Sequence, residues 1–223
     1  MIKKFEEFVK LNESNFNNDW LKILSRFLQL KSHKEGEKEH ILRNAVVPTK
    51  DKTNQTINCF FDFTGSSDKE TIYNFLCALV YLCVKNKYSY SKINVYGFGE
   101  RLSKPFAIDL QDEDVKSRYF DLIASRTIDF IKSQKVGENT ERFEEVVEEI
   151  NILNQKNKDS VFLIFGDGIW KDLDSFEDCS SLRDICVIVC CSDFTYGKFS
   201  KTKLELELCG FKHIIYVNYK SLI

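Results

Sequence analysis

The stretch INCFFDFTGSS, residues 57–67, decides the fold of this chain of 223 residues. Its first part is mainly apolar and rich in phenylalanine, a composition that favours a buried β-strand. The strand runs into DFTGS, residues 62–66, where the glycine allows a tight turn. A helical pattern follows over residues 69–85, and residues 93–98 again contain β-branched and aromatic residues. This order of strand, helix and strand is typical of a parallel α/β sheet.

The remainder of the chain continues this alternation. Residues 105–110 follow the second strand after only a short turn, which is too short for a parallel crossover, so we expect an antiparallel hairpin at the sheet edge. Later apolar runs predict strands over residues 161–165, 185–191 and 214–217. Helical patterns span residues 114–134, 142–153 and 201–209. We therefore predict a doubly wound, mostly parallel α/β sheet with one antiparallel edge strand and helices on both faces.

The first part of the chain differs from the rest in its pattern of apolar and charged residues. Apolar residues recur with helical spacing between Trp20 and Leu28, which predicts an amphipathic helix. A charged and turn-rich region follows it. We therefore predict an N-terminal helical extension and linker over residues 1–55 and a main domain over residues 56–223. The apolar stripe of the helix either packs on the main domain or docks another chain.

Composition and charge argue against several function classes. The 32 Lys and Arg residues against 34 Asp and Glu leave a net charge of -2, so no basic field would attract nucleic acid. The longest apolar run, residues 75–84, is far shorter than the roughly 20 residues that span a bilayer, and the start MIKKFEE does not resemble a signal peptide. The eight cysteines contain no CxxC pair, which favours reduced, buried thiols. We expect a cytoplasmic protein without nucleic-acid or membrane partners.

Oxygen-bearing side chains occur in three of the predicted loops. Asp62, Thr64 and Ser66 alternate at the end of the first strand. Thr140 immediately precedes a predicted helix, and Asp167 stands between two glycines after the strand of residues 161–165. In an open parallel sheet, ligands bind beyond the carboxyl ends of the strands. Because hard cations such as Mg²⁺ prefer oxygen ligands, this pattern suits a small divalent cation.

The same five positions resemble the metal-ion-dependent adhesion site of the von Willebrand factor type A (VWA) domain family. That site is written D-x-S-x-S, followed by a threonine in a later loop and an aspartate commonly followed by glycine. The matching residues are Asp62, Thr64, Ser66, Thr140 and Asp167. The resemblance covers about residues 56–221. Thr64 replaces the usual first serine but keeps its hydroxyl, and Glu138-Asn139 stands where many members have a glycine.

The resemblance implies a binding function. Thr64 and Ser66 would bind Mg²⁺ directly, with Mn²⁺ or Ca²⁺ as alternative ions. Thr140 would bind it in one state, and Asp62 and Asp167 would act directly or through waters. The cation would capture an acidic side chain of a partner protein, so we expect a non-enzymatic interaction module. An AAA+ ATPase of the MoxR type, or a larger assembly, is the kind of partner that the family implies.

Other interpretations of the same residues stay open. Asp62 and Asp167 could simply cap turns or helices after strands. A Mg²⁺-dependent hydrolase, with Asp62 as nucleophile or metal ligand, is an alternative function on the same sheet. A third possibility is a structural interaction domain whose metal site is vestigial.

Overall fold

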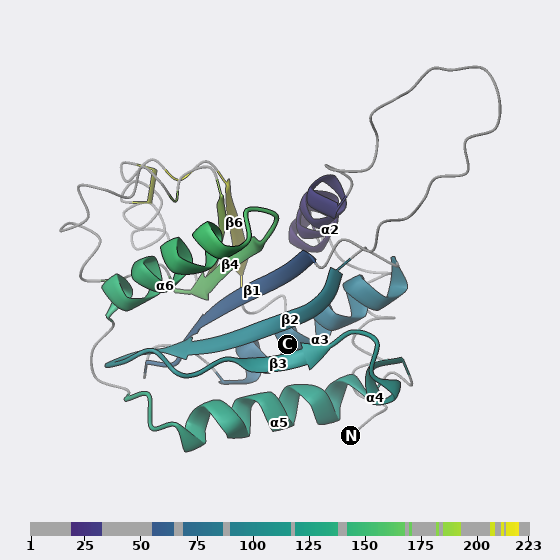
Figure 1. The fold of residues 1–223 in the computed structure, drawn as a ribbon, viewed down its shortest axis with the longest axis horizontal. Coiled ribbons are helices and arrows are strands. Elements are labelled where there is room, and N and C mark those ends of the chain that lie inside the picture. The colour runs from purple at the N-terminus through teal and green to yellow at the C-terminus, as the bar shows by residue number, and fades with distance from the viewer. Residues whose placement is uncertain are drawn as a thin grey trace.

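The computed structural model describes a six-stranded sheet with helices packed on it (Figure 1). The described residues are 19–32, 55–64, 69–86, 90–116, 119–137, 142–167, 170, 182, 185–192, 206–207, 211 and 213–218. The strands are β1 (Gln55–Asp62), β2 (Tyr90–Phe98), β3 (Phe106–Asp109), β4 (Val161–Gly166), β5 (Cys186–Ser192) and β6 (His213–Asn218). The helices are α2 (Asp19–Ser32), α3 (Lys69–Lys85), α4 (Glu113–Lys116), α5 (Phe120–Ser133) and α6 (Phe143–Lys156).

The strand order is β3-β2-β1-β4-β5-β6. Every neighbouring pair is parallel except β2 and β3, which form the antiparallel edge. The chain leaves β1 toward β2 and later returns to the other side of β1 at β4, so the strand order reverses between β1 and β4. These observations confirm the predicted fold class, a doubly wound and mostly parallel α/β sheet of the VWA-like or Rossmann-like type.

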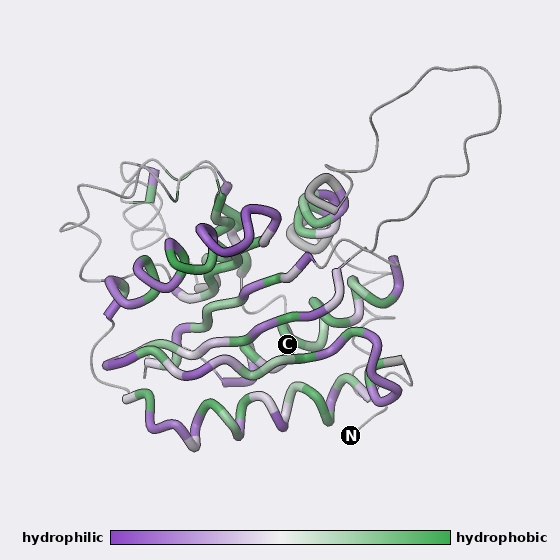
Figure 2. The backbone as a smooth tube through the Cα atoms, in the orientation of Figure 1, coloured by the Kyte–Doolittle hydropathy of each residue, from purple (hydrophilic) through white to green (hydrophobic). Residues whose placement is uncertain are grey.

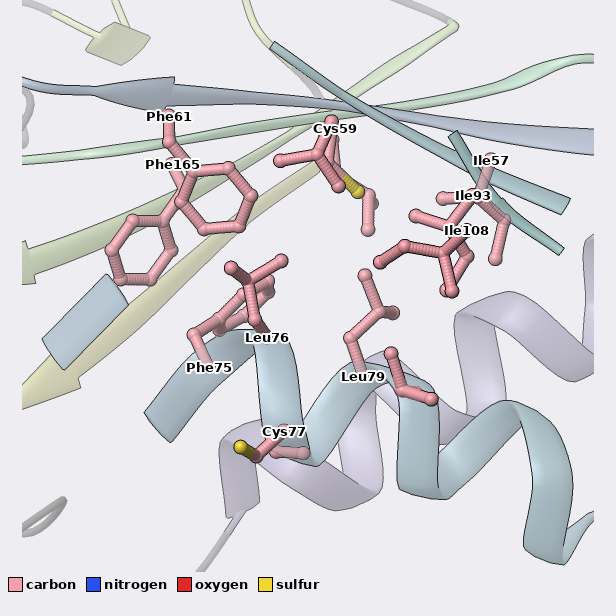
Figure 3. Packing of buried hydrophobic residues seen from close by; sticks show 14 of the residues in the cluster. Ile57, Cys59, Phe61, Phe75, Leu76, Cys77, Leu79, Ile93, Ile108 and Phe165 are labelled. Carbon is pink, nitrogen blue, oxygen red and sulfur yellow. The ribbon is translucent and has the colours of Figure 1, made fainter. Parts of the chain in front are cut away.

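Both faces of the sheet are buried, which explains why β1 is apolar almost throughout. Successive side chains of a strand point to opposite faces. Ile57, Cys59 and Phe61 face a hydrophobic cluster shared with α3 and α5, whereas Phe60 faces a second cluster shared with α6. Figure 3 shows the first cluster, in which Phe75 of α3 lies beneath the rings of β1 and β4. In Figure 2, α5 and α6 alternate between hydrophobic and hydrophilic residues, as helices that cover a sheet do.

Helix α2 packs against this sheet through its apolar stripe. Leu24 and Leu28 are fully buried and belong to the cluster on the α3 side. The Tyr90 hydroxyl donates a hydrogen bond of 2.9 Å to the Leu28 carbonyl, and the rings of Phe27 and His213 lie 5.6 Å apart. The predicted helix is therefore present and packs on the domain. Residues 33–54 lie outside the described part, and the division at residue 55 stays a prediction.

One predicted helix differs from the structure. The pattern over residues 114–134 predicts a single helix, but α4 and α5 are separate and Tyr119, before α5, has a non-helical ψ of 50°. Val115 and Phe120 are both buried in the same cluster. Residues five apart on a continuous helix point about 140° away from each other. The break lets both side chains reach the core. Of the helix predicted over residues 201–209, only residues 206–207 are described, and they are helical.

The described cysteines are buried free thiols, as the sequence predicts. The described cysteines 59, 77, 83, 186 and 190 are free and buried. Burial, together with the nearby Asp167 carboxyl, raises the pKa of the Cys190 thiol to about 12.

Among the described helices, none combines the length and the hydrophobicity needed to cross a membrane.

Candidate metal centre

Two of the predicted acidic residues meet where the strand order reverses. Asp62 is the last residue of β1, and Asp167 directly follows β4. The two strands are parallel neighbours with Phe61 opposite Phe165, so both carboxyls lie at the same edge of the sheet. Asp62 is fully buried and Asp167 is half-buried. Burial raises the pKa of the Asp62 carboxyl above its ordinary value, and the charge of the nearby Asp167 adds to the rise.

Thr64 fixes one oxygen of the Asp62 carboxyl. The Thr64 backbone N–H donates to Asp62 Oδ1 over 2.8 Å, and the Thr64 hydroxyl donates to the same oxygen over 2.6 Å. A bond from an aspartate to the N–H two residues later is a frequent way to turn the chain after a strand. The Phe63 N–H continues the sheet by donating to the Phe98 carbonyl over 2.8 Å. The D-x-T spacing therefore places Thr64 where it both turns the chain and donates two hydrogen bonds to the Asp62 carboxyl.

The second oxygen of Asp62 is buried without a hydrogen-bond partner among the described residues. Burial is the largest cause that raises the pKa of this carboxyl, and the two Thr64 bonds offset it only in part. A buried ionised carboxylate without full compensation is costly for folding. A divalent cation at this position would supply the missing compensation. The carboxyls of Asp62 and Asp167 and the hydroxyl of Thr64 are oxygen donors, so they fit Mg²⁺.

Gly166 lets a third side chain approach Asp62. A Cβ atom at Gly166 would lie 3.0 Å from Asp62 Cβ and 3.1 Å from Trp170 Nε1. Trp170 is buried, and its ring stacks on Phe143 with the centroids 4.6 Å apart and the planes 9° from parallel. Trp170 is not among the site residues predicted from the sequence. The available signal was an aromatic residue three positions after Asp167, in a loop at the carboxyl end of a strand.

Cys190 of β5 contacts the backbone of Asp167, where the chain leaves β4. Its thiol donates a hydrogen bond of 3.1 Å to the Asp167 carbonyl. The thiol is free and buried, as the sequence predicts for the cysteines. The contact ties the start of the Asp167 loop to β5.

The remaining predicted ligands, Ser66 and Thr140, lie outside the described residues. The described residues on either side of residues 138–141 both contact Gly99, which follows β2. The Arg142 N–H donates to the Gly99 carbonyl over 2.8 Å, and a Cβ at Gly99 would collide with the Gly137 carbonyl. The structure thus brings Asp62 and Thr64 close to Asp167, and the role of the five residues as metal ligands stays a prediction. Within the described ranges, no three His, Cys, Asp or Glu residues form a group that could hold a metal.

Comparison with known proteins gives a distant structural likeness. No family model matches the chain, and no curated protein matches it in sequence. Among solved structures, the chain is similar to the manganese-loaded TRAP protein of Plasmodium vivax. The two are 14% identical, the match covers 76% of this chain and 70% of that chain, and the TM-score is 0.41. The description of the fold therefore rests on the strand order and register of the sheet itself.

Proposed function

We propose that this chain is a protein-interaction module that holds a divalent cation and presents it to an acidic side chain of a partner. The proposed ligands are Asp62, Thr64, Ser66, Thr140 and Asp167, with Mg²⁺ as the first ion and Mn²⁺ or Ca²⁺ as alternatives. The observation that carries the proposal concerns Oδ2 of Asp62, which is buried and has no hydrogen-bond partner in the described part of the chain, next to the Thr64 turn and near Asp167.

The hydrogen-bond directions favour this role. The Thr64 hydroxyl gives its hydrogen to Asp62 Oδ1, so it is the oxygen end of this group, the end that a cation binds, that is not used in this hydrogen bond. Asp62 holds that hydroxyl in place through one oxygen and keeps the other for the cation or a water bound to it. A hard divalent cation supplies positive charge and exchangeable water positions in such a site. An acidic side chain of a partner can replace one of those waters, which makes binding depend on the cation.

The same geometry argues against hydrolysis. Asp62 is fully buried, and one of its oxygens already accepts two hydrogen bonds from Thr64. A nucleophilic carboxylate must reach the reacting atom of its substrate. A haloacid-dehalogenase-like hydrolase would also have a second aspartate where Thr64 stands. Turnover of phosphoester substrates with Mg²⁺ that vanishes in Asp62→Asn would overturn the non-enzymatic part of the proposal.

The partner class is also part of the proposal. The resemblance implies a MoxR-type AAA+ ATPase or a larger assembly, which would offer an aspartate or glutamate to the cation. Affinity capture from a cell extract with MgCl₂ and with EDTA tests this dependence. Partners that are retained equally under both conditions would contradict capture through the cation.

The central experiment is calorimetric titration of the EDTA-treated chain with MgCl₂ and MnCl₂. We expect saturable binding to one site in the wild type, its loss in Asp62→Asn, and an affinity reduced by about 10-fold or more in Thr64→Val. Asp129→Asn is the matched control, because Asp129 is an exposed carboxylate on α5 and is not one of the proposed ligands. Absence of saturable binding in the folded wild type, or equal loss in Asp129→Asn, would contradict the proposed site.

A further inference from the structure

Two unpartnered polar atoms meet beside Gly166. Among the described residues, Asp62 Oδ2 lacks a donor and Trp170 Nε1 lacks an acceptor, and both atoms are buried. Asp62 Cβ and Trp170 Nε1 both crowd the position that a side chain at Gly166 would occupy, at 3.0 and 3.1 Å. Buried polar atoms are nearly always hydrogen-bonded, so an adjacent unpaired donor and acceptor require an explanation.

The orientation of the Trp170 indole is set by packing. Its ring lies parallel to Phe143 at 4.6 Å and meets Phe98 edge-on at 6.2 Å. These rings belong to α6 and β2, so two different elements fix the plane of the indole. A ring fixed in this way keeps its N–H in one direction. The N–H lies close enough to Asp62 to lower the pKa of its carboxyl, although it completes no hydrogen bond.

We propose that Trp170 is a positioning residue of the cation site, whose indole N–H donates to Asp62 Oδ2 when a cation is bound. The inference rests on the proposed function and extends it to a residue outside the five predicted ligands. Thr64 would hold Oδ1, and Trp170 would hold Oδ2 through one of its two lone pairs, which leaves the other lone pair of Oδ2 for the cation or a water bound to it. Donors that orient a metal-binding carboxylate typically change metal affinity by about 10- to 100-fold when they are removed.

Trp170 also links the two acidic residues. It lies three positions after Asp167, in the segment that leaves β4, whereas Asp62 ends β1. A hydrogen bond from Trp170 to Asp62 would therefore join the segments after the two central strands. Cation binding and closure of this contact would favour each other, because each fixes the same carboxyl.

The test uses variants that separate the N–H from the packing. Trp170→Phe keeps an aromatic ring beside Phe143 but removes the donor, and we expect the dissociation constant for Mg²⁺ to rise by about 10-fold or more. Phe143→Leu is the matched control, because it removes the stacked partner and keeps the indole N–H. We expect it to lower the melting temperature while changing the Mg²⁺ affinity less than Trp170→Phe does.

A spectroscopic signature completes the test. The chain has 2 tryptophans, so Trp20→Phe leaves Trp170 as the single emitter. We expect MgCl₂ to change the emission of this variant with the same midpoint as the calorimetric titration. Unchanged Trp170 emission together with wild-type affinity in a folded Trp170→Phe variant would overturn the inference and leave the proposed function intact. Absence of Mg²⁺ and Mn²⁺ binding in the wild type would overturn both.

Discussion

Thr64 donates two hydrogen bonds to a single oxygen of Asp62, one from its backbone over 2.8 Å and one from its hydroxyl over 2.6 Å. The pair therefore leaves Oδ2 of the same carboxyl for another contact. Because the hydroxyl bond joins a neutral donor to a carboxyl in a buried setting, it contributes about 1.5–3 kcal/mol when the carboxyl is ionised. This relationship makes Thr64 the residue with the clearest double role, in the turn and in the site.

The first prediction concerns the side chain at position 64. Thr64→Val removes the hydroxyl and keeps the shape, so we expect both a lower melting temperature and a Mg²⁺ affinity reduced by about 10-fold or more. Thr64→Ser keeps the hydroxyl, and we expect it to retain Mg²⁺ binding. Calorimetry and thermal unfolding in parallel check both effects. Equal Mg²⁺ affinities of the Val and Ser variants would show that the hydroxyl is not a ligand.

The second prediction follows from the raised pKa of Asp62. Burial raises this pKa above its ordinary value of 3.8, so the folded chain holds the proton more tightly than the unfolded chain does. The stabilising contribution of the protonated carboxyl is fully present below the unfolded pKa and is lost as the pH rises through the folded pKa. Without a cation, the carboxyl that ionises above its folded pKa therefore destabilises the fold.

The variant Asp62→Asn tests whether the ionised Asp62 carboxyl destabilises the fold. Without divalent ions, we expect the difference in melting temperature, Asp62→Asn minus wild type, to be largest at pH 7 to 8. This difference should fall as the pH is lowered through the folded pKa of Asp62, because the wild-type carboxyl then becomes neutral. Asp129→Asn, at an exposed site, is the control. A difference between Asp62→Asn and wild type that does not change with pH would contradict the assignment.

A third prediction concerns the effect of the cation on stability. A ligand at 100 times its dissociation constant stabilises the folded state by about 2.7 kcal/mol, which corresponds to about 5–10 °C in melting temperature for a chain of this size. We expect MgCl₂ to raise the melting temperature of the wild type by this amount, EDTA to reverse the rise, and Asp62→Asn to abolish it. A similar rise in Asp62→Asn would indicate that the ion binds elsewhere.

Local sequence patterns predicted most of the sheet. The alternation of apolar strands and amphipathic helices gave the elements and the edge hairpin, because both faces of the central strands are buried. The contact between Asp62 and Thr64 was also predictable in kind, since it joins residues two apart. The break between α4 and α5 was not, because it depends on Val115 and Phe120 reaching one core cluster.

The role of Trp170 could not be predicted from local patterns. Its neighbours Phe98, Phe143 and Asp62 come from three other elements, and only the folded sheet brings them together. Its place in the sequence, a loop after a strand, does not distinguish it from other aromatic residues. Long-range packing of this kind requires knowledge of the strand order.

A fourth prediction uses the close approach at Gly166. A methyl group there would lie 3.0 Å from Asp62 Cβ and 3.1 Å from Trp170, so in Gly166→Ala these neighbours must give way by a few tenths of an ångström. We expect a loss of about 1–3 kcal/mol in stability and weaker Mg²⁺ binding. Val161→Ala, at the other end of β4, is the control for destabilisation alone. If both variants bind Mg²⁺ like the wild type, the spacing at Gly166 serves only the fold.

The last prediction tests whether α2 is an integral part of the domain. Leu28 is fully buried in the core cluster, and its carbonyl accepts the Tyr90 hydroxyl bond of 2.9 Å. Leu28→Ala leaves a cavity, so we expect a loss of about 2–5 kcal/mol and a fall of at least about 4 °C in melting temperature. Ile23→Ala is the control, because Ile23 lies on the same helix with 51% of its surface exposed, and it should change stability little. If Leu28→Ala unfolds like Ile23→Ala, α2 contributes nothing to the core; a selective loss means that deleting the N-terminal segment would damage the fold as well as any docking role.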